Sequence, residues 1–261
     1  MKEELYVDDV IVPLIAISKS NESKFRFLGT GFYVDKKGHL VTCLHIVNSC
    51  IEERLFAYQI GKKKELELTI IKKSDKYDLA LCKSAPSGIE TTWPFINKPY
   101  VDIGSDVEAY GYVHEPFGPN ELPFRQRYMK GYISGIPRDP NYSDSFELSF
   151  PILFGMSGSP LICHLPIEGN NKRQTGIIGC NYGSRESAIV QHTVETTVNY
   201  EERVSKIVEL GLSYLPNAIF SIFKNSDIEI NLYAEENHAG MGSVLFSCFS
   251  KETPAVADNT S

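Results

Sequence analysis

Residues 155–160 read Gly-Met-Ser-Gly-Ser-Pro, and this segment decides which kind of fold the chain adopts. The glycine beside Ser157 lets the backbone turn sharply and leaves the serine hydroxyl exposed. Gly155, two positions before the serine, lets an N–H approach a developing oxyanion with no Cβ in the way. The G-x-S-x-G pattern of α/β-hydrolases is not completed, because Ser159 occupies the place of its second glycine. The segment therefore predicts a nucleophilic serine on a different fold.

A nucleophilic serine needs a base to take its proton and an acid to orient that base. His45 follows the apolar run Leu40–Cys43, and Asp78 opens the apolar run Asp-Leu-Ala-Leu. Along the chain the order is histidine, aspartate, serine, whereas α/β-hydrolases have serine, acid, histidine and subtilisins have aspartate, histidine, serine. Each residue alone is more simply structural, but the three together predict a catalytic triad.

Two nearby residues compete for these roles. Asp75 precedes the apolar run that Asp78 opens, so we expect it at the surface. His39 follows the turn at residues 36–38, and we expect its side chain to point away from the active site. His45 and Asp78 are therefore the favoured base and acid.

Most of the chain consists of short β-branched and aromatic-rich runs separated by turn residues, which is typical of β-sandwiches and barrels. One group of runs precedes residues 86–99 and another follows them, so we expect two barrels joined by that connection. A helix is expected at Glu201–Leu212, because Val204, Ile207 and Val208 recur at helical spacing.

The chain resembles trypsin-like serine peptidases of the chymotrypsin fold, and most closely the compact bacterial protease domains of the HtrA type. The resemblance extends over about residues 25–212. The segments that carry it are Gly29–Phe32, Leu40–Thr42 leading to His45, Asp78–Leu81, Ile103–Ser105, Val107–Tyr112, Gly131–Gly135, Gly155–Pro160 and Thr175–Gly179. It implies an all-β fold of two six-stranded antiparallel barrels with the active site between them.

The resemblance also implies how the chain is divided. Residues 1–92 would form the N-terminal barrel that carries His45 and Asp78. Residues 93–212 would form the C-terminal barrel that carries Ser157, together with the closing helix. Residues 213–261 would be a small C-terminal extension.

By the same resemblance, Ser157 is the nucleophile, His45 the general base and acid, and Asp78 the orienting carboxylate. The backbone N–H groups of Gly155 and Ser157 would form the oxyanion hole. The expected activity is that of a serine endopeptidase that hydrolyses peptide bonds through a covalent acyl-enzyme, with no metal or other cofactor.

Two departures from the trypsin group matter. Met156 stands where that group has an aspartate that pairs with a newly cleaved N-terminus, so activation by that ion pair is not expected. Ile46 follows His45 where that group has a cysteine, so no disulfide is expected there. We also expect no PDZ-like domain after the second barrel, because about 50 residues are too few for one.

The primary specificity pocket is expected from two segments. Its walls would be formed by Pro151, Ile152, Leu153 and Phe154 and by Gly179, Cys180 and Asn181. Pro151 stands where a buried carboxylate would select arginine or lysine, so an apolar or small side chain is the expected preference. Glu186 or Asp144 could overturn this by reaching the pocket from a loop.

The composition is that of an ordinary globular protein, with 42% hydrophobic and 23% charged residues among 261. The net charge of −7 argues against binding to a nucleic acid backbone, and no segment is apolar for long enough to span a membrane. The six cysteines have no metal-binding spacing, so we expect buried, reduced thiols in a cytoplasmic protein. The expected partners are a protein or peptide substrate and a regulatory protein.

Residues 213–250 are too apolar to remain in water, so we expect them to pack, either as a β extension or as a regulatory element. The last ten residues are polar and are expected to be frayed.

Two alternatives to a peptidase stay open: a catalytically inactive binding or scaffold module built on a protease fold, and a non-peptidase acyl hydrolase. The presence of all three triad residue types disfavours the inactive module.

Overall fold

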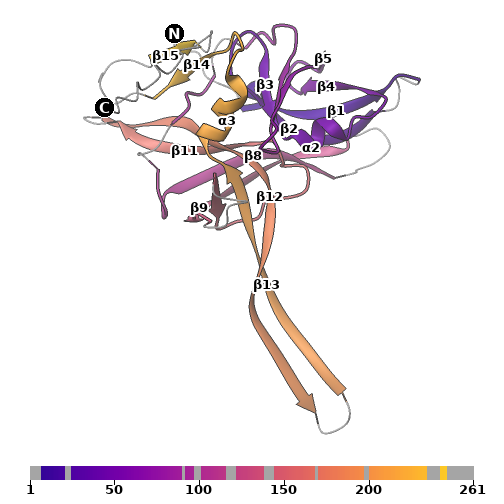
Figure 1. Ribbon diagram of the computed structural model, residues 1–261, viewed down its shortest axis with the longest axis vertical. Coiled ribbons are helices and arrows are strands. Elements are labelled where there is room, and N and C mark those ends of the chain that lie inside the picture. Colours follow the sequence, from indigo (N-terminus) through magenta and orange to yellow (C-terminus); the bar gives the residue numbers. More distant parts are fainter. Residues whose placement is uncertain are drawn as a thin grey trace, which may run out of the picture.

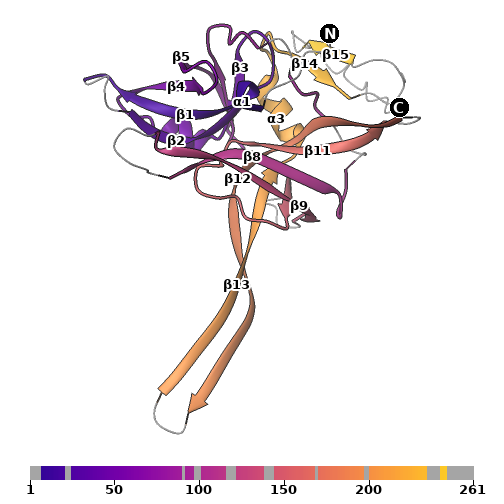
Figure 2. The same ribbon diagram turned by 180° about the vertical axis from the view of Figure 1, so that it is seen from behind.

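The chain forms an N-terminal antiparallel sheet and a C-terminal closed barrel, which lie side by side in both views (Figures 1 and 2). The structure is a computed structural model. It describes residues 7–20, 25–89, 92–96, 101–115, 122–137, 144–167, 170–196, 200–233 and 242–245.

The N-terminal sheet has seven strands in the order β5-β4-β1-β2-β3-β7-β6. These are β1 (Ile11–Ser18), β2 (Phe25–Tyr33), β3 (His39–Thr42), β4 (Glu53–Gln59), β5 (Lys64–Glu67), β6 (Thr69–Lys73) and β7 (Ala80–Lys83), with the short helices α1 (Val7–Val10) and α2 (Leu44–Asn48). Strand β1 is buried along nearly its whole length, which explains why its sequence is almost entirely apolar.

The expected closed six-stranded N-terminal barrel is instead this seven-stranded open sheet. The two end strands, β5 and β6, are consecutive in the chain and are separated only by Leu68. Leu68 N–H donates to Leu55 O at 2.8 Å, so the chain crosses from one end of the sheet to the other at this residue. The sheet therefore curls into a half-barrel, but its ends are not paired with each other.

The C-terminal unit is the closed six-stranded barrel that was expected, with the order β10-β13-β12-β11-β8-β9. Its strands are β8 (Asp106–His114), β9 (Phe124–Gly135), β10 (Ser145–Leu148), β11 (Pro160–Ile167), β12 (Asn170–Thr196) and β13 (Tyr200–Tyr214). The all-β, chymotrypsin-like fold class is thus confirmed.

The helix expected at Glu201–Leu212 is wrong, because these residues lie in strand β13. β13 pairs with β12 from Cys180↔Tyr214 out to Thr196↔Tyr200, and the two strands extend from the body as a long hairpin (Figures 1 and 2). The apolar residues at helical spacing are mostly β-branched, and such residues favour strands when a partner strand is available.

A C-terminal helix does exist, but it begins later in the chain. Helix α3 (Pro216–Phe223) has proline at its start, where the missing N–H costs nothing, and it is followed by β14 (Glu229–Leu232) and β15 (Gly242–Leu245). Its buried apolar side chains and those that follow are Ala218, Ile219, Ile222, Phe223, Ile228 and Ile230. Burial of each large one is worth about 1.5–3 kcal/mol, so the extension is held firmly.

The expectation that the extension packs is therefore confirmed for residues 213–233. Phe95 forms backbone bridges with both Ile177 of β12 and Leu232 of β14, which joins the extension to the barrel. Residues 234–241 and 246–250 lie outside the described residues, as do the last ten residues, which were expected to be frayed.

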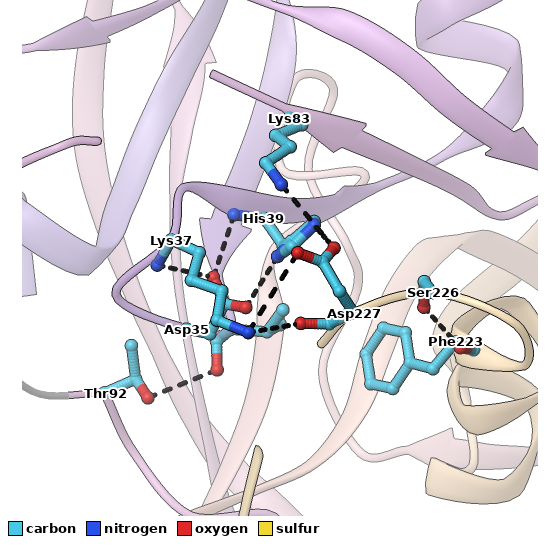
Figure 3. A network of polar contacts seen from close by, with 9 residues as sticks. Asp35, Lys37, His39, Lys83, Thr92, Phe223, Ser226 and Asp227 are labelled. Carbon is cyan, nitrogen blue, oxygen red and sulfur yellow. Dashed lines mark hydrogen bonds and ion pairs between the residues drawn. The ribbon is translucent and has the colours of Figure 1, made fainter. Parts of the chain in front are cut away.

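A polar network fastens the extension to the N-terminal sheet (Figure 3). The carboxylate of Asp227, which lies between α3 and β14, is 3.1 Å from His39 Nε2 and 3.5 Å from Lys83 Nζ. Lys37 Nζ donates to the Asp227 carbonyl oxygen at 2.7 Å. On its other side the buried His39 ring meets Asp35, with Nδ1 2.6 Å from Oδ2.

The described cysteines Cys43, Cys50, Cys82, Cys163 and Cys180 carry free thiols, and all but Cys50 are buried, in agreement with the sequence analysis. Among the described helices, none has the length and apolar character needed to cross a bilayer.

Candidate active site

The turn that carries Ser157 is shaped by two glycines with positive φ. Met156 N–H donates to Leu153 O at 2.9 Å, and Gly155 has φ +97° at the third position of this turn, where only glycine is free of strain. A Cβ at Gly155 would lie 2.7 Å from the Phe27 ring and 2.8 Å from Tyr112 O. Gly158 has φ +83°, and a Cβ there would lie 2.1 Å from Thr30 O. The Gly-Met-Ser-Gly pattern is therefore required by the local backbone.

The same turn is fastened to the N-terminal sheet by Thr30 of β2. Thr30 N–H donates to Ser157 O at 3.0 Å, and the Thr30 hydroxyl donates to Gly155 O at 2.8 Å. On the barrel side, Gly158 N–H donates to Asn181 O at 2.7 Å. Ser157 is thus held where the two halves of the molecule meet.

Within residues 155–159, two backbone N–H groups have no acceptor among the described residues. Met156, Gly158 and Ser159 each donate to a backbone carbonyl. Within the described part of the chain, the N–H groups of Gly155 and Ser157 donate to no acceptor. They are the two donors that the sequence analysis assigned to an oxyanion hole, and they are left available for an acceptor from outside.

His45 and Asp78 are brought together by helix α2 and the loop before β7. His45 Nδ1 lies 2.5 Å from Asp78 Oδ2, and His45 N–H donates to Oδ1 at 2.7 Å. The carboxylate therefore holds both the ring and the backbone of His45. Because Nδ1 faces a carboxylate, the proton belongs on Nδ1 and the other ring nitrogen, Nε2, is the acceptor.

The histidine lies next to the serine turn and is open to solvent. A Cβ on Gly158 would lie 3.2 Å from the backbone nitrogen of Cys43, and Cys43 is two residues before His45. The Cys43 thiol donates to Asn181 O, the same carbonyl that binds Gly158 N–H. The His45 side chain is 52% exposed, so a molecule from solvent can reach it.

Ser157 is not hydrogen-bonded to His45 in this state. Its hydroxyl donates to Tyr182 O at 3.3 Å, and no bond to His45 occurs within the described residues. Bonds between a nucleophile and its base are commonly long or misaligned before substrate binds. A bond to His45 would require the Ser157 hydroxyl to leave Tyr182 O.

Cys43, His45 and Asp78 place ligand atoms within 4.8 Å of one another, which is a spacing that a metal ion could use. The donors do not suit one. Burial raises the pKa of the Cys43 thiol well above its ordinary value, and metals bind the thiolate. Both oxygens of Asp78 already accept hydrogen bonds from His45.

The residues expected to form the specificity pocket fall into two groups. Ile152 is buried and half-buried Pro151 and Leu153 flank it, while Phe154 is 86% exposed beside the serine turn. Ile152 is tied to β12 by hydrogen bonds of its N–H and carbonyl with the Ser184 hydroxyl, at 2.7 and 3.2 Å.

The second group lies deeper. Gly179, Cys180 and Asn181 are all buried, and Asn181 Nδ2 donates to the Ser159 hydroxyl at 2.9 Å. Asn181 therefore supports the serine turn from its buried side. Glu186 is exposed on the β12 hairpin.

The sequence analysis missed an aromatic cluster next to the site. Tyr182 stacks on Tyr214 with ring centroids 4.0 Å apart, and Tyr77 meets Tyr214 edge-on at 5.5 Å. The Tyr214 hydroxyl accepts the N–H of Asp78 at 3.1 Å. The only signal in the sequence was that Tyr77 directly precedes Asp78, because the other two come from distant strands.

Comparison with known proteins agrees with the fold. The HtrA-type protease AlgW with decapeptide superposes with a TM-score of 0.54 at 15% identity, covering 82% of this chain and 63% of that one. A variant of AlgW with decapeptide gives a TM-score of 0.52 at 15% identity, covering 81% and 61%. At this identity the likeness concerns the fold.

A relative by sequence is the uncharacterized protein y4bJ of Sinorhizobium fredii, which is 25% identical over 189 residues. The match covers 71% of this chain and 27% of y4bJ, so the chain spans about a quarter of that protein's length. The profile of the trypsin-like peptidase domain matches residues 29–165, which is more than half of the chain. The chain belongs to the trypsin-like peptidase domain family.

Proposed function

We propose that this protein is a serine endopeptidase in which Ser157, His45 and Asp78 form the catalytic triad. The observation that carries the proposal is the contact of Asp78 with both Nδ1 and N–H of His45, at a ring that solvent can reach. Membership of the trypsin-like peptidase family supports it. The site would lie between an N-terminal unit, residues 1–92, and a C-terminal unit, residues 93–212.

The first half of the reaction uses the Ser157 hydroxyl, His45 Nε2 and the two N–H groups of the serine turn. The Ser157 hydroxyl leaves Tyr182 O and donates to His45 Nε2, which takes the proton as Ser157 Oγ attacks the scissile carbonyl carbon. The carbonyl oxygen becomes an oxyanion and accepts hydrogen bonds from the N–H groups of Gly155 and Ser157, which have no acceptor among the described residues. His45 then gives its proton to the leaving amine, and the acyl group stays on Ser157.

The second half repeats these steps with water. His45 takes a proton from water as the water oxygen attacks the acyl carbon. The bond between that carbon and Ser157 Oγ then breaks, His45 returns the proton to Ser157, and the carboxylic acid product leaves. Asp78 stays ionised throughout. It keeps the proton of the resting ring on Nδ1 and stabilises the positive charge that His45 carries in between.

The substrate we propose is a protein or peptide chain with an apolar or small residue before the cleaved bond. The HtrA-type protease AlgW was solved with a decapeptide, which supports a peptide as the class of ligand. The carboxylate of Asp144 is not expected to enter the pocket, because Lys76 and Tyr77 both donate hydrogen bonds to it.

Because the described thiols are free and mostly buried, we propose a cytoplasmic location.

Labelling with a fluorophosphonate probe tests the proposal. Wild type should be labelled, Ser157→Ala and His45→Ala should not, and the exposed remote serine variant Ser20→Ala should be labelled like wild type. Unlabelled wild type would support the inactive binding module instead. The hydrogen bond from the Ser157 hydroxyl to Tyr182 O is the observation that favours that module. Labelling and ester turnover without peptide turnover would indicate a non-peptidase acyl hydrolase.

A further inference from the structure

The loop that carries Asp78 is held by contacts on two sides. On the side of its own unit, Ser74 N–H donates to Leu79 O at 3.0 Å and the Asp78 carboxylate contacts His45. The loop follows β6, which is the end strand of the sheet and is mostly exposed. Inside the loop, the Ser74 hydroxyl accepts the N–H groups of Lys76 and Tyr77 at 3.2 and 2.9 Å. Leu44 N–H donates to Asp78 O at 3.2 Å. Further support comes from outside the sheet.

That support comes from the barrel, and three successive residues reach it. Lys76 Nζ and the Tyr77 hydroxyl both donate to Asp144 Oδ2, each at 2.7 Å. Asp78 N–H donates to the Tyr214 hydroxyl at 3.1 Å. Every residue from 76 to 78 is thus bound to the other half of the molecule.

The two barrel residues are themselves adjacent. Asp144 directly precedes Ser145, which is paired with Tyr214 across β10 and β13. Asp144 O also accepts the N–H of Leu215 at 2.9 Å. The Asp144 carboxylate and the Tyr214 hydroxyl therefore belong to one surface of the barrel, and this surface binds the Asp78 loop.

The same surface extends to the nucleophile. The Ser145 hydroxyl is 3.0 Å from the Tyr182 hydroxyl, and the Tyr182 ring stacks on Tyr214. The carbonyl oxygen of Tyr182 accepts the Ser157 hydroxyl. Displacement of the Asp78 loop relative to this surface would therefore change the placement of the His45–Asp78 pair relative to Ser157.

Of the two groups that bind Asp144, Tyr77 is the better protected. The hydrogen bonds from Lys76 and Tyr77 hold the pKa of Asp144 below its ordinary value, so the carboxylate is ionised at neutral pH. The Lys76 side chain is 70% exposed, and such surface ion pairs contribute little. Tyr77 is half-buried and its ring packs on Tyr214, so its charge-assisted bond is the one that holds the loop.

We infer that Tyr77 and Asp144 are positioning residues for the catalytic carboxylate. Neither contacts the reacting atoms. Their hydrogen bond fixes the loop so that Asp78 stays aligned with Nδ1 of His45. The inference rests on the proposed peptidase function, because it assigns these residues to the triad of that function.

A double-mutant cycle tests this in the full chain. The variants are Tyr77→Phe, Asp78→Asn and the double variant, with kcat and KM measured on one peptide substrate. The matched control is Tyr128→Phe, which removes another tyrosine hydroxyl from a carboxylate, that of Glu108, on the barrel. Folding of each variant is checked by circular dichroism and thermal melting.

Tyr77→Phe should lower kcat about tenfold with KM little changed, which is the size expected when a hydrogen bond to a charged group is lost. In the Asp78→Asn background it should cost nothing more, because it acts through that carboxylate. The kcat and KM of Tyr128→Phe should be those of wild type. Equal losses in both backgrounds, or no loss in wild type, would overturn the inference.

Asp144→Asn provides a second variant that keeps size and an acceptor oxygen. It should show a smaller loss of kcat in the same direction, because the amide still accepts the Tyr77 hydroxyl but has no charge. An Asp144→Asn variant that raises KM and leaves kcat unchanged would place Asp144 at the substrate and contradict a positioning role.

A readout that needs no activity separates this inference from the proposed function. The Nδ1 proton of His45, which faces Asp78, is followed by proton NMR. It should be sharp in wild type and Tyr128→Phe and be broadened by exchange in Tyr77→Phe. An unchanged signal would overturn the positioning role even in an inactive protein, while a wild type unreactive to fluorophosphonate would overturn only the function.

Discussion

Two histidine–aspartate pairs lie in neighbouring elements of the N-terminal sheet, and their hydrogen bonds are almost equally short. His45 Nδ1 is 2.5 Å from Asp78, and His39 Nδ1 is 2.6 Å from Asp35. Their exposure differs sharply. The His45 and Asp78 side chains are 52% and 30% exposed, whereas those of His39 and Asp35 are 1% and 3% exposed. A short histidine–aspartate contact therefore does not identify a catalytic pair.

The second ring nitrogen, Nε2, distinguishes the two pairs. His39 Nε2 is taken by Asp227, so both nitrogens of this ring are used inside the fold. His45 Nε2 has no partner within the described residues, and it lies beside the turn of Ser157. The His39–Asp35 pair binds the extension to the sheet, whereas we propose that the His45–Asp78 pair accepts a proton from outside the fold. Four predictions test this contrast.

The largest difference is expected from removing the two rings. His45→Ala should lower kcat/KM by about 10⁶-fold, because triad members act as a unit, and should leave the melting temperature close to that of wild type. His39→Ala, measured in its folded fraction, should keep activity within a few fold of wild type. A His45→Ala variant with wild-type peptidase activity would remove His45 from the mechanism.

Neutralising the two acids gives the next largest contrast. Asp78→Asn should lower kcat by about 10⁴-fold, since the amide no longer selects the tautomer with the proton on Nδ1. Asp35→Asn should instead lower stability, because Asp35 also accepts the N–H groups of Lys37 and His39. Kinetics and urea unfolding of both variants are the measurements. Comparable losses of kcat would show that the two pairs are functionally linked.

The stability of the buried pair is the third test. His39→Ala should lower the free energy of unfolding by about 3 kcal/mol, because it leaves the Asp35 carboxylate buried without its partner. Urea unfolding at neutral pH measures this, with His45→Ala as the exposed control. Equal stability of the two variants would contradict a structural role for His39.

The smallest effect concerns Asp227 and depends on pH. Burial acts to raise the pKa of Asp227, but the positive charges of His39, Lys83 and Lys37 outweigh it and hold the pKa below its ordinary value. Ionised Asp227 therefore stabilises the fold above about pH 4, and this contribution is lost as the pH falls through the lowered pKa.

Asp227→Asn should accordingly be slightly less stable than wild type at pH 6, and the difference should shrink toward pH 3. Melting temperatures of both proteins across this range provide the comparison, and the effect is small because Asp227 is 64% exposed. A difference that stays constant with pH would mean that the charge of Asp227 plays no part.

The local parts of the site were readable before the structure was known. The Gly155–Ser157 turn needs glycine at a positive φ, and a segment of a few residues carries that information by itself. The order of His45, Asp78 and Ser157 indicated the fold class, which the barrel and the family match confirm. The catalytic roles of the three residues stay predictions until the labelling experiment is done.

The errors arose where partners are distant. The Glu201–Leu212 segment has helical spacing, but its conformation is decided by the β12 strand that pairs with it. For His39, which was expected to point away from the site, the sequence left open only its partner, because nothing near it in the chain could show that Asp227 binds its ring. Propensity is a weak local preference, and pairing with a distant strand overrides it.

What the linear order of residues determined was the serine turn, the histidine–aspartate–serine order and a β-rich fold, because each depends on backbone conformation or composition within short segments. Only the folded chain decided which histidine is buried and which is open, and how the Asp78 loop meets Asp144 and Tyr214. The physical reason is that burial and hydrogen-bond partners are set by strands far apart in sequence, whose side chains become neighbours only when both halves of the molecule have closed on each other.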